Sequence, residues 1–314
     1  MNLPAQFGPL DTAVLPSSPL HLAIGMFDGV HLGHQAVIEA AVQSARRSGG
    51  VAAVLTFAPH PSALFRPDQP THLIMDARTK ARVLGRLGVA AMITQPFTPE
   101  FARIAAEDFI PWLQQRAPRL ATIYVGENWR FGRGRSGDIA LLVAEGKKHG
   151  LQVFSSPRVK LDGEPISSTR LRTLLVAGEI EAVNGLLGYI YFSEGEVVTG
   201  QRLGRTMGFP TLNLSWQPDL RPRFGVYMVR VSGAKAAGPL PGVANFGQRP
   251  TVEQAAEPRL ETHVLGDCPF GAGDEISVEW LRFLRPETKF AGIMELRAQI
   301  ERDRAAAAED FSLR

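Results

Sequence analysis

The sequence predicts an α/β domain built on a parallel sheet, followed by a compact antiparallel β-barrel with a closing helix. Up to about residue 185, short apolar runs alternate with segments of helical period, which is typical of a parallel sheet covered on both faces. Beyond about residue 187, runs with a period of two are separated by turns rich in glycine and proline, as in a small barrel. The length of 314 residues also suits two domains, which we expect at residues 1–186 and 187–314.

The first part is expected to contain alternating strands and helices. Buried strands are predicted at Leu20–Gly25, Val51–Phe57, Ala90–Ile93 and Thr122–Val125. Helices are predicted at Gln35–Arg47, Asp76–Leu87, Ala105–Gln115 and Ile139–His149, with a helix pair at Ser168–Val176 and Ile180–Leu186. Ligands of such sheets bind at the carboxyl ends of the strands, so the loops after the strands are where chemistry is expected.

The second part is expected to be a barrel. Its strands are predicted at Tyr191–Val198, Gly225–Val231, Arg259–Leu265 and Ile276–Leu284. An amphipathic helix at Lys289–Arg304 then closes the chain, with Ile293, Leu296 and Ile300 on one face. The alanine-rich stretch Ala305–Ala308 is expected to be a fraying helix terminus.

Composition and charge exclude several classes of protein. Hydrophobic residues make up 45% and charged residues 21% of the chain, which excludes a wholly disordered chain, a collagen-like repeat and a coiled coil. The 34 basic and 31 acidic side chains leave a net charge of +3, too small an excess to indicate a nucleic-acid partner.

Targeting and compartment signals favour a cytoplasmic protein without a membrane partner. No apolar run reaches the roughly 20 residues that span a bilayer, and the N-terminus lacks the pattern of a signal peptide. The single cysteine, Cys268, can form no internal disulfide and no cysteine-based metal site, which argues for a reducing compartment. The oligomeric state is not predicted.

A stretch rich in glycine and histidine, Gly25 to His34, joins the first expected strand to the first helix. Gly25 and Gly29 permit tight turning, and Gly33 lets a phosphate approach the backbone closely. His31 and His34 are three residues apart at a helix start, so both rings lie on one face, beside an N-terminus that attracts anions. Two imidazoles there suit charge stabilisation on a reacting α-phosphate. The stretch resembles the HxGH signature of nucleotidyltransferases, which leaves the acceptor open.

Two further segments of the first part carry candidate ligand groups. Ile166–Arg172 begins a helix with hydroxyls at its cap and two arginines in its first turn, where cations oppose the helix dipole and serve better as triphosphate ligands. A serine cap with solvated arginines is the alternative. Val125–Gly132 follows a strand and brings amides and aromatics to a place where a base or flavin ring could stack. Its alternative is a loop anchored in the core by Trp129.

In the second part, the glycine-rich stretch Gly204–Asn213 carries Thr211 and Asn213 two residues apart. Such residues face the same way in an extended segment, so the hydroxyl and the amide can converge on one Mg²⁺–phosphate. The glycines upstream form a loop able to wrap phosphates. A barrel corner rich in glycine and proline would look similar.

Glu261 lies on an expected barrel strand, on the same face as His263. A carboxylate in that position is either a surface residue or a base directed at a substrate hydroxyl. The period-two pattern does not distinguish the two.

Several motifs together carry a specific resemblance that covers residues 20 to 304. In chain order they are GMFDGVHLGH, VGENWRFG, ISSTRLR, GRTMGFPTLN, PGVANFGQRPT, LETHVL and LRPETKF with the later ELRAQIERD. On these residues the chain resembles the bacterial bifunctional riboflavin kinase/FAD synthetase family. The resemblance implies a Rossmann-like nucleotidyltransferase domain that adenylylates FMN to FAD, and a C-terminal barrel that phosphorylates riboflavin. It also implies ATP and Mg²⁺, with riboflavin, FMN and FAD as substrates and products.

The resemblance further implies roles for individual residues. In the kinase, Glu261 matches the catalytic base, Thr211 and Asn213 match the Mg–ATP residues, and the other ATP-binding positions are Gly204, Thr206, Gly208 and Pro210. In the adenylyltransferase, His31 and His34 are expected to be catalytic and to contact the ATP phosphates. The remaining positions expected to bind ATP or its phosphates are Gly25, Phe27, Asp28, Gly33, Ser167, Ser168, Thr169 and Arg172. Those expected to bind flavin or nucleotide are Phe57, Asn128, Trp129, Arg130 and Phe131.

Three positions depart from the family's pattern, and two other functions stay open. Ala58 and Gly266 stand where the family often has acidic residues, with Asp267 following Gly266, and Trp129 replaces another aromatic. One alternative function is an adenylyltransferase for another acceptor joined to an unrelated barrel, against which GFPTLN and LETHVL argue. The other is a flavin-binding regulator without catalysis, against which the presence of all the expected catalytic residues argues.

Overall fold

The computed structural model describes residues 3–15, 17–200, 208–248 and 258–312, and the chain divides into two compact units, residues 1–168 and 169–314. The helices α7 (Ser168–Ala177) and α8 (Ile180–Leu187) fall largely in the second unit. The Asn184 side chain ties α8 to the barrel, because its amide donates to the Trp280 carbonyl at 2.9 Å and accepts from the Tyr191 amide at 2.7 Å. The domain boundary at residues 186/187 stays a prediction based on the change of sequence pattern.

The first unit is built on a six-stranded parallel sheet with the strand order β1-β4-β3-β2-β5-β6. In chain order the strands are Ala5–Phe7, Leu20–Ile24, Val51–Ala58, Ala91–Pro96, Leu120–Gly126 and Gln152–Ser156. The four predicted strands are confirmed. The two edge strands, β1 and β6, escape the sequence pattern because they are short and largely exposed, so they carry no apolar run.

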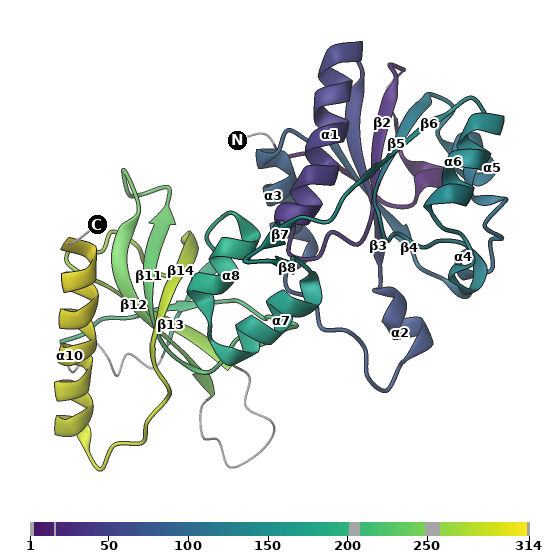
Figure 1. The fold of residues 1–314 in the computed structure, drawn as a ribbon. Coiled ribbons are helices and arrows are strands. Elements are labelled where there is room, and N and C mark those ends of the chain that lie inside the picture. The colour runs from purple at the N-terminus through teal and green to yellow at the C-terminus, as the bar shows by residue number, and fades with distance from the viewer. Residues whose placement is uncertain (1–2, 16, 201–207, 249–257, 313–314) are drawn as a thin grey trace. The chain divides into compact units, whose positions relative to one another are not determined.

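Helices cover both faces of this sheet, as the alternating pattern predicts. In Figure 1, α1 (Leu32–Ser48) and α3 (Ala77–Arg86) lie on one face, and α5 (Phe109–Arg116) and α6 (Ile139–Lys148) lie on the other. The shorter elements are α2 (Pro61–Phe65), α4 (Pro99–Ala102), the 3₁₀ turns η1 (Leu10–Thr12) and η2 (Arg133–Arg135), and the hairpin β7 (Lys160–Leu161)–β8 (Glu164–Pro165).

The second unit contains a closed antiparallel barrel with the strand order β10-β13-β12-β11-β14-β9. From β9 to β14 the strands are Phe192–Val198, Leu212–Leu214, Gly225–Gly233, Leu240–Gln248, Pro258–Val264 and Glu275–Arg285. Its interior is filled by aromatic rings, of which Trp280, Tyr227 and Phe246 are fully buried. Trp280 contacts the other two, with ring centroids 4.5 Å and 5.7 Å apart.

The final helix α10 (Ile293–Ser312) packs on the outer face of the barrel (Figure 1). The predicted fraying of Ala305–Ala308 is wrong, because Ala307 is fully buried in a cluster with Val226 and Met228. A small side chain lets the helix approach the strands closely, and the helix therefore continues to Ser312. Ile293, predicted on the apolar face, is 62% exposed. Within the described part of the chain, no helix combines the length and the apolar character that a membrane crossing requires.

Candidate functional site

The predicted phosphate loop leaves the carboxyl end of the sheet strand β2 and leads into α1. Phe27, Gly29 and Val30 have positive φ angles of 46°, 85° and 37°, a conformation that is strained for residues other than glycine. Neighbouring groups hold the loop in place. The buried Asp28 carboxylate accepts hydrogen bonds from the Ile74 amide at 3.0 and 3.1 Å, and the backbone carbonyl of Asp28 accepts one from a serine hydroxyl described below.

That serine is Ser168, the first residue of α7, whose hydroxyl donates to the Asp28 carbonyl at 2.8 Å. The first unit therefore brings one predicted triphosphate residue, Ser168, onto the loop that precedes the two histidines. Ser167, beside it, is half-buried. Thr169 and Arg172 follow on α7 in the second unit.

Lys80 lies beneath the same loop and was not predicted. Its ammonium donates to the Met26 carbonyl at 2.8 Å and lies 3.4 Å from the Thr56 hydroxyl, which itself donates to Met26 at 3.0 Å. Burial lowers the pKa of Lys80, and the Asp28 carboxylate acts in the opposite direction. The signal that could have revealed it is a lysine within the apolar stripe of α3, next to the buried Ala81 and Leu84.

His31 and His34 lie together, as their spacing predicts. His31 caps α1, and its Nδ1 accepts a hydrogen bond from the His34 backbone amide at 3.2 Å. The two rings stack with centroids 3.6 Å apart and an interplanar angle of 14°. Because Nδ1 is an acceptor, the neutral ring carries its hydrogen on Nε2. Burial lowers the pKa of His31 to about 4, so the ring is a neutral hydrogen-bond donor at pH 7.

The lowered pKa of His31 predicts a stability loss on acidification. Between pH 6.5 and 4 the unfolded chain binds a proton at His31 that the folded chain excludes, so the free energy of unfolding falls as the pH falls. From pH 7 to pH 5 the loss attributable to this side chain is roughly 2 kcal/mol. Urea unfolding at both pH values should show that His31→Asn, which keeps a capping oxygen without titrating, is less acid-sensitive by this amount. Equal acid sensitivity of the two proteins would contradict the prediction.

The predicted flavin residues after β5 divide into exposed and packed side chains. Asn128 and Arg130 are exposed. Trp129 stacks on Phe131 with centroids 4.8 Å apart and an angle of 11°, and Phe131 is buried in the core of the first unit beside Phe109. The packing of Trp129 thus matches the core-anchor alternative as well as a flavin-contacting role.

Phe57, at the end of β3, belongs to an aromatic cluster that only the fold assembles. Its ring lies 5.5 Å from Phe101 and 6.1 Å from Phe97, and Phe97 lies 5.9 Å from Phe65. Phe65, on α2, is 63% exposed. Phe65 and Phe97 were missed because they come from separate connections and share no local motif.

Residues predicted for the kinase meet on the outer face of the barrel, beneath α10. A cavity of about 420 Å³ is lined by Thr211 and Glu261, together with Asn245 and residues of the last helix. The strand register explains this. Glu261 is paired with Asn213 on β10 and with Asn245 on β12, and paired residues in a sheet point to the same face. Glu261 is half-buried, so its carboxylate faces a space of ligand size.

The polar groups of this face fit a hard cation such as Mg²⁺. Asn213 is buried, and its Oδ1 has no hydrogen-bond partner among the described residues. An amide oxygen and a hydroxyl are oxygen ligands of the kind that Mg²⁺ takes alongside phosphates. In the described ranges, no three His, Cys, Asp or Glu side chains are grouped to hold a metal ion. Of the other predicted ATP-binding positions, Gly204 and Thr206 lie outside the described residues, and Gly208 and Pro210 are exposed.

A half-buried ion pair fastens α10 over the cavity. Arg285, at the end of β14, contacts the Asp303 carboxylate of α10 through Nε at 3.1 Å and Nη2 at 2.8 Å. Both residues line the cavity. They were not predicted, although Arg285 lies in the quoted LRPETKF motif.

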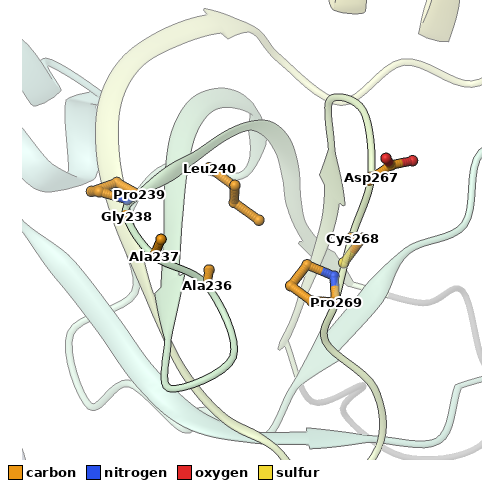
Figure 2. Close-up of a pocket in the computed structure, with 8 residues that line it drawn as sticks. All are labelled: Ala236, Ala237, Gly238, Pro239, Leu240, Asp267, Cys268 and Pro269. Atoms are coloured by element: carbon orange, nitrogen blue, oxygen red, sulfur yellow. The ribbon is translucent and has the colours of Figure 1, made fainter.

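A second pocket, of about 500 Å³, lies between two barrel connections, as Figure 2 shows. It is lined by Ala236–Leu240 and by Asp267, Cys268 and Pro269. None of the described site predictions lines it. Gly266, one of the departures from the family pattern, takes a positive φ of 95° just after β13, and the following Asp267 lines this pocket and not the cavity under α10.

Comparisons with known proteins cover both units. The FAD synthetase family model matches residues 16–170, and the riboflavin kinase family model matches residues 187–311. The chain is 38% identical to the bifunctional riboflavin kinase/FMN adenylyltransferase of Escherichia coli K12 over 95% of both chains. It is 35% identical to the protein of that name from Bacillus subtilis, over 93% of this chain and 92% of the relative.

A solved structure, described as a macrolide-efflux protein from Streptococcus pneumoniae, has the same fold over 98% of this chain and 99% of its own, with a TM-score of 0.84 and 27% identity. The two family models and the full-length relatives agree with the geometry of the two units, each of which contains its own set of clustered polar residues. The chain therefore belongs to the family of bifunctional riboflavin kinase/FMN adenylyltransferases.

Proposed function

We propose that the two units catalyse consecutive ATP-dependent reactions, phosphorylation of riboflavin to FMN at the barrel and adenylylation of FMN to FAD at the start of α1. The observation that carries the proposal is the pair of separate clusters, the stacked His31 and His34 in one unit and the cavity with Glu261 in the other. Because the one cysteine is free and exposed, we place this activity in the reducing cytoplasm.

In the kinase step, Glu261 accepts the proton of the riboflavin 5′-hydroxyl as that oxygen attacks the γ-phosphorus of ATP. A new P–O bond forms, the bond to the β-phosphate oxygen breaks, and ADP leaves with the electron pair. The half-buried position of Glu261 supports this role. The same cavity is lined by Phe209, Phe290 and aliphatic side chains, which suit a flat apolar ring system.

Thr211 and Asn213 would hold Mg²⁺, which supplies charge neutralisation on the ATP phosphates when bound. Removing one oxygen ligand with Thr211→Ala should therefore raise the Mg–ATP concentration needed for half-maximal FMN formation. Steady-state kinetics with riboflavin held saturating measures this. The control is Thr173→Ala on α7, an exposed threonine whose hydroxyl donates to the Thr169 carbonyl of the same helix. An unchanged Mg–ATP requirement in T211A would remove Thr211 from the metal site.

In the adenylyltransferase step, a phosphate oxygen of FMN attacks the α-phosphorus of a second ATP, and pyrophosphate leaves as the new P–O bond forms. The nucleophile is already an anion, so the step needs no covalent intermediate. The Nε2–H of His31, the His34 ring and the N-terminus of α1 stabilise the developing charge. Ser167, Ser168, Thr169 and Arg172 are proposed to hold the triphosphate.

The exposed aromatic cluster of the first unit offers a surface for the flavin ring. The Phe97 ring lies 6.1 Å from the Phe57 ring and 5.9 Å from the Phe65 ring, between centroids, and aromatic rings stack favourably on flat π-systems. We include Phe65 and Phe97 with Phe57 as flavin-contacting residues, together with Asn128 and Arg130 of the loop after β5.

Product analysis tests the proposal directly. Incubation of the purified protein with riboflavin, ATP and Mg²⁺, followed by chromatography, should yield FMN first and FAD later. Unchanged riboflavin would favour the flavin-binding regulator. An adenylyltransferase for another acceptor joined to an unrelated barrel would likewise leave riboflavin unchanged, and it would also form no FAD when FMN is supplied. FMN that accumulates without FAD would confine the proposed activity to the barrel.

A further inference from the structure

His263 lines the cavity under α10 and has no role in the proposed phosphoryl transfer. It lies two residues after Glu261 on β13 and on the same face. Its Nδ1 lies 2.8 Å from the carbonyl oxygen of Pro210. A carbonyl can only accept, so Nδ1 carries the hydrogen and donates it. The second nitrogen, Nε2, is buried and has no hydrogen-bond partner in the described ranges.

The segment that His263 holds is the one that leads into the proposed metal ligands. The backbone ladder between β10 and β13 begins at the pair Leu212–Thr262, so strand pairing does not fix Thr211. Pro210 has no N–H and cannot extend the ladder as a donor. The His263 side chain therefore supplies the attachment just before Thr211 that the backbone cannot.

Phe209, which precedes Pro210, is contacted by side chains from two elements, β13 and α10. Phe209 is buried, and its ring meets the His263 ring edge-on, at 5.8 Å and 89°. The guanidinium of Arg304, on α10, lies over the Phe209 ring at 5.2 Å, a favourable cation–π distance. Contacts from β13 and α10 thus converge on Phe209 and Pro210.

We infer that His263 is a positioning residue of the kinase, which holds the Phe209–Pro210 segment and so sets where Thr211 and Asn213 lie opposite Glu261. The inference rests on the proposed function of Thr211 and Asn213 in binding Mg–ATP. It assigns His263 no contact with either substrate.

Two substitutions separate the donated hydrogen bond from the size of the ring. His263→Leu removes the donor, and His263→Asn keeps an N–H near the position of Nδ1. His263→Leu should raise the KM for Mg–ATP about tenfold, the upper range for one lost hydrogen bond, and should raise the KM for riboflavin less, although Phe209 lines the proposed flavin cavity. His263→Asn should recover most of the loss. FAD formation from supplied FMN should be unaffected in both. Equal kinetics of the Leu and Asn variants would overturn the inference.

Hydrogen–deuterium exchange measures the mobility of the backbone around Thr211 without an activity assay. Hydrogen–deuterium exchange of a peptide covering residues 208–214, measured without ATP or metal, should be faster in His263→Leu and close to wild type in His263→Asn. Unchanged exchange in the Leu variant would overturn the inference. Should that variant fail to fold, His263→Gln takes its place, because its amide lies near the Nε2 position and cannot replace the Nδ1 donor.

Combination with Thr211→Ala shows whether His263 acts through Thr211. If it does, the double variant loses less Mg–ATP affinity than the product of the two single losses, the remainder passing through Asn213. Multiplying losses would place the effect of His263 elsewhere and overturn the inference. A normal Mg–ATP requirement in T211A alone would instead overturn the metal assignment, and hydrogen exchange would still decide whether His263 holds the segment.

Discussion

Replacing His31 and His34 together by alanine should abolish FAD formation and leave FMN formation nearly intact. Both rings lie in the first unit, at the cap of α1, whereas every residue that lines the kinase cavity belongs to the second. Removal of one donor that stabilises charge in a transition state costs roughly 10²–10³ in rate, so the loss of both should bring FAD formation close to the background. The measurement is each half-reaction assayed separately, with riboflavin or with FMN supplied.

The matched control is His149→Ala, which removes an exposed histidine of the same unit and should leave both rates unchanged. Alanine at a helix cap also costs about 1 kcal/mol of stability, so urea unfolding must show that the first unit of the double variant is folded. Loss of FMN formation to the same degree in a folded double variant would contradict the assignment of two separate sites.

The parts of the fold that could be predicted are those in which burial leaves a local pattern. Val51–Ala58, in the middle of the sheet, is apolar except for Thr56, so the strand can be assigned from its own residues alone. By contrast, β12 (Leu240–Gln248) contains Pro241 and two glycines, so its own strand propensity is poor. It forms because β11 and β13 pair with it on both sides, and this information lies elsewhere in the chain.

The site divides in the same way. The spacing of His31 and His34 is a property of one helix turn, and their stacking follows from it. Lys80 left only the signal of a lysine within an apolar stripe. Phe97 and the positioning residue His263 contact groups distant in sequence, so no local motif reveals what they do. Glu261 is intermediate, because its strand and face were predictable, but the cavity in front of it requires α10.

Glu261→Gln should lower the kcat of riboflavin phosphorylation, by roughly 10²–10⁴-fold if the carboxylate is the general base. Glutamine keeps the size and hydrogen-bonding reach of the side chain but cannot take the hydroxyl proton. The KM for riboflavin should therefore change little and the barrel should stay folded. FAD formation from supplied FMN should be unchanged, since that step runs at His31 and His34.

The control for this substitution is Glu196→Gln, which makes the same chemical change at an exposed position of the barrel strand β9. In steady-state kinetics of FMN formation, Glu261→Gln should lower the kcat and Glu196→Gln should not, and neither should change the KM for riboflavin much. A raised KM with normal kcat in Glu261→Gln would mean that the carboxylate binds the substrate equally in the ground and transition states, and a normal value of both would make it a surface residue. Only a kcat loss confined to the kinase reaction assigns the proton transfer to Glu261. A loss of substrate binding would raise the KM for riboflavin, and a folding defect of the whole chain would also lower FAD formation from supplied FMN.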